Sequence, residues 1–180
     1  MSPTQGLPRL EGDGLILRDV EESDLDALVA IRTDPTVARW WDAIDEAEFR
    51  SDLRGDVEHE YHYLIEVNGE TAGMVQFYEE PEVAFRSAAI DIFLGAGWQG
   101  RQLGRRAIEL LTEYLFDQRG HRRLTIDPAE INVAAVRCYT AAGFRTVGVM
   151  REYQQMEDGT RLDGVLMELL ASDRPAAADR

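Results

Sequence analysis

The sequence contains no lysine, and all 19 of its basic residues are arginine. It also has a single cysteine, Cys138, so no disulfide can form within the chain. One thiol and three histidines provide no spacing typical of a zinc site, and we predict that no metal is bound. Long apolar runs are missing too, because the first, over residues 15–17, is far too short for a signal peptide or a membrane span. We therefore expect a soluble, cytoplasmic protein without a membrane partner.

Positive charge is scarce relative to negative charge, and the formal net charge is -15. Such an acidic surface repels phosphate groups, so we predict no nucleic-acid partner. It would suit a cationic substrate. A strong net charge also keeps a protein soluble, and the charge alone leaves both explanations open.

The length of 180 residues is that of one ordinary domain. A domain of this size buries roughly 70% of the surface of its unfolded chain, and so needs no disulfide or structural metal. We expect one domain over residues 1–172 and a frayed tail over residues 173–180, which read DRPAAADR. A monomer and a homodimer are both compatible with the sequence.

The apolar pattern predicts a mixed β-sheet. Residues 61–67 and 70–78 alternate in polarity around Asn68-Gly69, a pair that tolerates the positive φ of a type I′ hairpin turn. A further strand over residues 88–94 leads into a glycine-rich loop, after which helices alternate with strands. We therefore predict an α/β fold with a central mixed sheet of about seven strands and helices on both faces.

The glycine-rich loop reads GAGWQGRQLGRR over residues 95–106 and opens into an apolar helical segment. Residues 95–100 formally match the dinucleotide fingerprint G-x-G-x-x-G. A dinucleotide site also needs an acidic residue about 20 positions further on, whereas the next strand ends only at Asp127. A Walker loop does not fit either, because Arg101 and Gln102 stand where it needs lysine and serine or threonine. A dinucleotide site is the least favoured interpretation.

Residues 99–106 suggest another anion site. The free N–H groups at a helix N-terminus can surround a pyrophosphate, which glycines let approach closely and arginines attract. The segment resembles the coenzyme A loop of the GNAT acyltransferase superfamily, Gln/Arg-x-x-Gly-x-Gly/Ala. Taken alone, it could also be an ordinary glycine-rich turn. The resemblance implies that acetyl-CoA is bound by Gln99, Gly100, Arg101, Gln102, Leu103, Gly104 and Arg105.

One position departs from that loop pattern. Gln99 and Gly104 match it, whereas Gln102 stands where the family usually has glycine and could narrow the pyrophosphate site. We expect the loss to be small if Gln102 has a negative φ, because its backbone N–H then remains available. A coenzyme A-binding module without catalysis stays an alternative on account of this residue.

A more specific pattern follows in IDPAEINVAAVRCYTAAGF, residues 126–144. Asn132 and Tyr139 share one face of a helix, and Gly143 is placed to end it. The segment resembles the second GNAT signature, Asn-x-x-Ala-x-x-x-Tyr-x-x-x-Gly-Phe. The resemblance implies that Asn132 contacts the pantetheine arm and that Tyr139 protonates or hydrogen-bonds the departing thiolate. Tyr139 could instead be a buried ring with a satisfied hydroxyl, and Cys138 lacks a nearby histidine that would make it a nucleophile.

Residues 91–148 resemble one GNAT group more closely, the aminoglycoside 6′-N-acetyltransferases. The matching segments are AIDIFL, TIDP and RCYTAAGF. This resemblance implies an enzyme that moves an acetyl group from acetyl-CoA to the 6′-amine of an aminoglycoside by direct attack in a ternary complex. Other cationic acceptors remain open, namely a protein N-terminus, a polyamine or a siderophore amine.

Direct transfer needs a neutral amine, yet carboxylates that bind a polycation favour its ammonium form. We expect Asp91 to be the general base, through water because an ordinary aspartate pKa is only about 3.9. Asp127 would bind an ammonium group of the substrate, and a backbone N–H around Phe93 would hold the oxyanion. Asp91 could instead pair with arginine, and Asp127 could form an Asx turn before Pro128.

Trp40 and Trp41 could form a flat wall for the acceptor, with Asp42 as a partner for its positive charge. Paired tryptophans are also common core anchors. An acidic run at residues 79–82 could reach over the site, but a solvated acidic loop explains it more simply.

Overall fold

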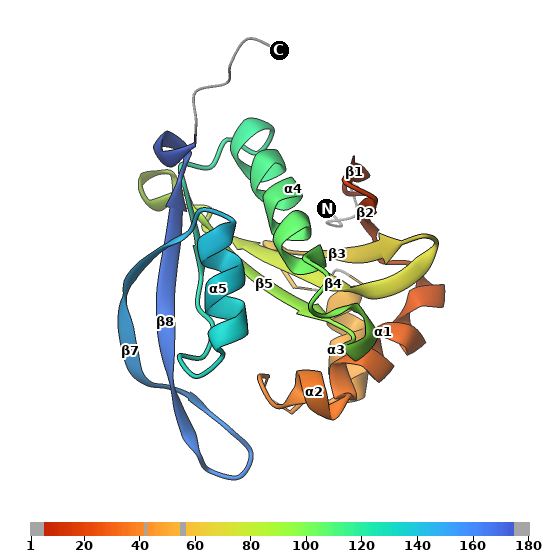
Figure 1. Ribbon diagram of the computed structural model, residues 1–180. Helices are drawn as coiled ribbons and strands as arrows, with labels where there is room; N and C mark the ends of the chain where they lie inside the picture. Colours follow the sequence, from red (N-terminus) through yellow and green to blue (C-terminus); the bar gives the residue numbers. More distant parts are fainter. Residues whose placement is uncertain (1–5, 42, 55–56, 175–180) are drawn as a thin grey trace.

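The computed structural model describes residues 6–41, 43–54 and 57–174. Within these ranges the chain forms one open sheet of eight strands in the order β1-β2-β3-β4-β5-β6-β8-β7 (Figure 1). All neighbouring strands are antiparallel except β5 and β6, which are parallel. The strands are β1 (Leu10–Gly12), β2 (Leu15–Asp19), β3 (Glu60–Val67), β4 (Glu70–Glu79), β5 (Ala88–Leu94), β6 (Arg123–Ile126), β7 (Arg145–Gln155) and β8 (Arg161–Leu170).

Helices cover both faces of this sheet. The core on one face joins the sheet to α4 and α5, with Leu111 and Tyr139 as members. The core on the other face joins it to α1–α3 through Leu28, Val37 and Leu53. The predicted α/β fold with helices on both faces is confirmed. The helices are α1 (Leu25–Thr33), α2 (Pro35–Ala38), α3 (Glu46–Leu53), α4 (Leu103–Asp117) and α5 (Val133–Ala141).

The prediction of about seven strands missed β1. This three-residue strand pairs with β2 across a tight turn in which Asp13 and Gly14 have φ values of 50° and 78°. Three residues are too few to produce a readable alternation of polarity. A short edge strand of this kind offers little backbone for pairing with another chain.

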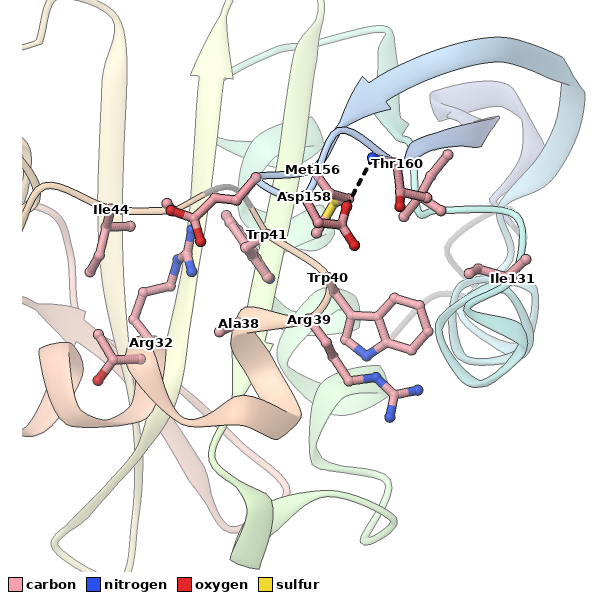
Figure 2. Close-up of a pocket in the computed structure, with 14 residues that line it drawn as sticks. Arg32, Ala38, Arg39, Trp40, Trp41, Ile44, Ile131, Met156, Asp158 and Thr160 are labelled. Atoms are coloured by element: carbon pink, nitrogen blue, oxygen red, sulfur yellow. Dashed lines mark hydrogen bonds between the residues drawn. The ribbon is translucent and has the colours of Figure 1, made fainter.

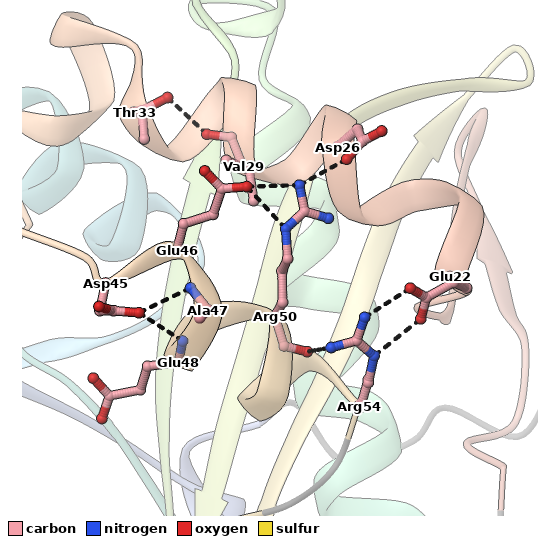
Figure 3. Close-up of polar contacts among 10 residues, drawn as sticks. All are labelled: Glu22, Asp26, Val29, Thr33, Asp45, Glu46, Ala47, Glu48, Arg50 and Arg54. Atoms are coloured by element: carbon pink, nitrogen blue, oxygen red, sulfur yellow. Dashed lines mark hydrogen bonds and ion pairs between the residues drawn. The ribbon is translucent and has the colours of Figure 1, made fainter.

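Ion pairs connect α3 to α1 and to the turn before it (Figure 3). Arg50 donates to Asp26 and to Glu46, and Arg54 donates to Glu22 through Nε and Nη2. Exposed pairs like these contribute little to stability, because solvent screens their charges. Apolar packing therefore supplies most of the energy that places α1–α3 on the sheet.

The tail begins inside the described residues. A 3-10 turn (Ala171–Asp173) follows β8, and Arg174 pairs with Asp117 of α4. Residues 175–180 lie outside the part of the chain that the structure describes. The frayed tail stays a prediction.

The parallel strands β5 and β6 separate soon after they meet. They share only the pairs Ala88–Leu124 and Ala89–Thr125. Beyond these pairs β5 continues beside β4 alone, while β6 stays beside β8. The sheet is therefore open between the second half of β5 and the end of β6.

Candidate active site

Two carboxylates face this opening. Asp91 and Asp127 each lie two residues beyond Ala89–Thr125, the last pair between β5 and β6. Side chains two residues apart on a strand point to the same face, so both carboxylates lie on one face of the sheet. Burial and the charge of Asp127 raise the pKa of Asp91 to about 6, and burial also raises the pKa of Asp127. A carboxyl group with a pKa near neutrality is well suited to accept and release a proton.

Neither aspartate has the alternative role considered in the sequence analysis, which was a pair with arginine for Asp91 and an Asx turn for Asp127. Among the described residues, Asp91 has no arginine partner, and its Oδ2 lies 3.5 Å from Nε2 of Gln76. Asp127 accepts a hydrogen bond from the Tyr153 hydroxyl rather than forming an Asx turn. Both groups are therefore available to a cationic ligand at the opening.

The sequence analysis missed Gln76 and Tyr78, which lie beside Asp91. Gln76 of β4 pairs directly with Asp91 of β5, and its Nε2 also donates to the Tyr78 hydroxyl at 3.1 Å. Burial and the nearby charge of Glu60 raise the pKa of Tyr78, which therefore stays protonated. A polar Gln76 within the apolar run of β4 was the available signal, but only the register shows that it faces Asp91.

Tyr139 approaches the same opening from α5. Its side chain is 8% exposed, and within the described ranges its hydroxyl has no hydrogen-bond partner. Burial, together with the charges of Cys138, Asp91 and Asp127, raises its pKa. The hydroxyl is thus protonated and free to donate, which the alternative of a satisfied buried ring does not explain.

The loop before α4 has two residues in the left-handed region. Gly100 has a φ of 73° and Gln102 a φ of 60°. The condition set in the sequence analysis, a negative φ at Gln102, is not met, because this position has the conformation that glycine adopts most easily. Gln102 is the N-cap of α4, but its side chain makes no capping hydrogen bond. The first-turn N–H groups of α4, from Leu103 to Arg105, therefore remain open to an anion.

Several loop side chains serve the fold. Leu103 is 3% exposed, and the Nε2 of Gln99 donates to the carbonyl of Leu94 at 2.9 Å. Gly104 lies where α4 packs on α5, and a Cβ at this position would be in ordinary van der Waals contact, 3.6 Å from Sγ of Cys138. Burial raises the pKa of Cys138, which argues against a thiolate nucleophile.

Arg101 and Arg105, two of the three arginines in residues 95–106, add positive charge to the loop. The guanidinium of Arg101 lies 5.3 Å from the ring centre of Trp98 and is exposed. Arg105 pairs with Glu109 one turn along α4. Both lie next to the free N–H groups, where an anion would gain from their charge.

The second signature forms the predicted helix. Asn132 is the N-cap of α5 and accepts a hydrogen bond from the N–H of Ala135 at 3.2 Å. Gly143, with a φ of 99°, follows the C-cap and ends the helix as expected. These two caps fix the length of α5, and thereby the position of Tyr139.

The backbone N–H of Phe93 does not face the opening. Gly95 donates to the carbonyl of Ala72, in the same uninterrupted register that joins β4 and β5. Alternate residues of a strand direct their backbone groups to the same neighbour, so Phe93 also faces β4. The N–H groups of Ile92 and Leu94 point to the open side instead, one residue away from the predicted position.

An open cleft of about 610 Å³ lies between α1, the segment after α2 and the tip of the β7–β8 hairpin (Figure 2). Trp40 and Trp41 line one side, and Glu157 and Asp158 of the hairpin tip line the other. The sequence analysis gave these two acidic residues no role. Asp42 lies outside the described residues.

The tryptophans are partly structural. The ring of Trp41 meets Phe93 edge to face at 5.6 Å, and so links the cleft to β5. Arg32 lies 4.8 Å from the ring centre of Trp41, and Arg39 lies 4.3 Å from that of Trp40. One face of each ring is therefore already covered by a cation.

The acidic run at residues 79–82 does not line this cleft. Glu79 accepts hydrogen bonds from Arg119 and its carboxylate contacts His121. Glu80 and Glu82 are exposed in the loop between β4 and β5. This loop lies before the start of β5, whereas the opening lies beside the second half of β5.

A profile of the acetyltransferase (GNAT) domain family matches residues 14–145, which is most of the chain. The chain belongs to this family. It is 29% identical over 161 residues to the aminoglycoside N(6′)-acetyltransferase type 1 of Klebsiella pneumoniae, with 77% of each chain covered. It is 28% identical over 143 residues to the spermidine N(1)-acetyltransferase of Escherichia coli K12, with 76% of each covered. The solved structure of AAC(6′)-Ib with paromomycin and acetyl-CoA matches with a TM-score of 0.76 at 26% identity, covering 93% of this chain and 100% of that one.

Membership of the GNAT family confirms the resemblance, the fold and the enzyme class. GNAT acetyltransferases use acetyl-CoA, which supplies an activated acetyl thioester, and the uncapped N-terminus of α4 fits its pyrophosphate. No helix in the described part of the chain is long and apolar enough to cross a membrane. The described residues also contain no group of three or more His, Cys, Asp or Glu side chains that could hold a metal.

Proposed function

We propose that this GNAT enzyme transfers the acetyl group of acetyl-CoA to a primary amine of a cationic small molecule. The observation that carries the proposal is the pair Asp91 and Asp127 at the opening of the sheet, both with raised pKa values and without arginine partners among the described residues. Two carboxylates so close together favour a ligand with positive charge. The first candidate acceptor is the 6′-amine of an aminoglycoside, and the second is a polyamine.

The named relatives support both candidates. One is an aminoglycoside N(6′)-acetyltransferase and the other a spermidine N(1)-acetyltransferase, at nearly equal identity to this chain. The acidic hairpin tip of the cleft, Glu157 and Asp158, suits either acceptor, because both are polycations. The amine that is acetylated is therefore a matter for experiment.

Each residue at the opening has a proposed part in the transfer. As the amine attacks the thioester carbonyl, Asp91 takes its proton, directly or through one water. The N–H of Ile92 or Leu94 stabilises the oxyanion. The Tyr139 hydroxyl donates to the sulfur as the carbon–sulfur bond breaks. Asp127 holds a further ammonium group of the acceptor.

The cofactor has its own proposed contacts. The N–H groups of Leu103, Gly104 and Arg105 hold the pyrophosphate, and Arg101 adds charge. The amide nitrogen of Asn132 reaches the pantetheine arm, while its oxygen caps α5. This division leaves the acceptor cleft free of cofactor contacts.

The release of free thiol from acetyl-CoA tests this function, with kanamycin, spermidine and a basic peptide as separate acceptors and no amine as control. We expect amine-dependent turnover with kcat/KM of about 10⁴ M⁻¹s⁻¹ or more for at least one small cation. Glu157→Gln should raise the KM of that acceptor, whereas Glu82→Gln, a matched change on the distant loop, should not. Equal KM values in both variants would remove the hairpin tip from the acceptor site, and turnover with the peptide alone would overturn the small-molecule assignment.

A further inference from the structure

Strand β7 contains a bulge opposite β8. The ladder pairs Met150 with Gly164 and then Gln154 with Leu162. Three residues of β7, 151–153, therefore stand opposite one residue of β8. Bulges of this kind redirect a side chain and are frequent next to active sites.

The bulge is held in a strained form. Glu152 has a φ of 52°, which is uncommon for a residue with a side chain. Its N–H donates to Oδ1 of Asp163 at 2.7 Å, and its carboxylate pairs with Arg161. Strained backbone persists only where its surroundings fix it, and these two contacts fix it here.

The redirected side chain is Tyr153. Its hydroxyl donates to Oδ2 of Asp127 at 2.7 Å, across β8. The ring reaches that point only because it passes over Gly164, where a Cβ would lie 2.7 Å from Cδ1 of the ring. Real Cβ atoms do not approach so closely, so a side chain at residue 164 would displace the ring.

Tyr153 is not an anchor of the core, because 52% of it is exposed. The next residue, Gln154, donates from Nε2 to the carbonyl of Trp40 at 3.4 Å. The bulge thus lies between the opening of the sheet and the cleft beside Trp40. An acceptor that spans both would pass the Tyr153 hydroxyl.

We propose that Tyr153 is a positioning residue for the acceptor and acts through Asp127. Its hydrogen bond holds Oδ2 of Asp127 and leaves Oδ1, which has no partner among the described residues, for an ammonium group. A fixed carboxylate binds that group at lower entropic cost than a mobile one. This inference rests on the proposed binding of a cationic acceptor.

Tyr153→Phe tests the inference, because it keeps the ring over Gly164 and removes only the hydroxyl. We expect the acceptor KM to rise by roughly 3- to 10-fold, while kcat and the KM of acetyl-CoA stay within about twofold. In an Asp127→Asn background, Tyr153→Phe should have no further effect, since residues that act as one unit are not additive. Gly164→Ala should reproduce the KM effect by displacing the ring, and thermal unfolding of each variant checks that it is folded.

The outcomes separate the inference from the function on which it rests. If the parent enzyme releases no thiol with any amine, the proposed function fails, and the inference fails with it. If the parent is active but Tyr153→Phe leaves the acceptor KM unchanged, or raises it equally in the Asp127→Asn background, only the inference is overturned. A fall in kcat alone would also overturn it, because Tyr153 would then act on the transition state.

Discussion

The charge state of one side chain, Asp91, sets the expected pH dependence. Burial, and then the charge of Asp127, raise its pKa to about 6. A base works only when it is ionised, so kcat/KM should fall as the pH drops below about 6 and level off above it. Thiol release measured from pH 4 to 9 with an acceptor that stays protonated checks this. If kcat/KM instead fell only near pH 4, the ordinary pKa range of aspartate, burial would not raise the pKa of the catalytic base.

Gln102 is a second residue whose effect on the free energy of unfolding can be tested. A side chain at a φ of 60° is strained, and glycine is not, so Gln102→Gly should raise the free energy of unfolding by roughly 0.5–1 kcal/mol. The matched change Gln118→Gly, at a φ of -108°, should lower it instead. Denaturant unfolding measures both, and calorimetry with coenzyme A should find binding at least as tight in Gln102→Gly. Weaker binding would show that the glutamine side chain contacts the cofactor.

The residues of the opening differ in how far the sequence predicts them. Asp91, Asp127 and Tyr139 lie in segments that the family resemblance singled out, and the structure brings them together around one gap. Tyr153 was missed because its direction depends on a bulge and on a glycine in the neighbouring strand. No spacing along the chain encodes that contact. The φ of Gln102 could not be predicted for a related reason, since the loop geometry is set by the whole turn rather than by the residue type at position 102.

Among the elements, the end of β4 carries a buried charge network that stabilises the sheet. Burial alone would raise the pKa of Glu79, but hydrogen bonds with His121 and Arg119 outweigh it and lower the pKa to about 2. A lowered pKa means that this stabilisation is complete above about 4.5, the unfolded value, and is lost as the pH falls toward 2. Replacing the carboxylate leaves the buried His121 and the partly buried Arg119 without this partner.

Glu79→Gln should therefore lower the free energy of unfolding by about 2–3 kcal/mol at pH 7. The control is Asp117→Asn, which breaks the exposed pair with Arg174 and should cost less than about 1 kcal/mol. Urea unfolding at pH 7 compares the two variants. Equal losses would mean that burial adds nothing to the Glu79 network.

Local signals predict some elements and miss others. Asn68 and Gly69 adopt the positive φ values expected of the hairpin turn, Asn132 is the N-cap of α5, and Gly143 follows its C-cap. The short strand β1 pairs with the adjacent β2, but its three residues are too few to show an alternation of polarity. The separation of β5 from β6 has no local signal, because it depends on pairing between strands that are distant in sequence.

Over the whole molecule, the net charge of -15 and the open sheet point to one kind of reaction. An acidic protein attracts polycations and concentrates them near its surface. The uncapped helix at the loop attracts an anion instead, so acceptor and acetyl donor approach from sites of opposite character. In the proposed function, these two sites meet at the opening between β5 and β6.

Amine-dependent thiol release by Asp91→Asn and by the parent enzyme tests this account most directly, with coenzyme A binding measured for both. We predict that the parent turns over kanamycin or spermidine, and that Asp91→Asn lowers kcat by tens-fold or more with coenzyme A affinity unchanged. An Asp91→Asn enzyme as fast as the parent, or a parent that binds coenzyme A and transfers acetyl to neither amine, would contradict it.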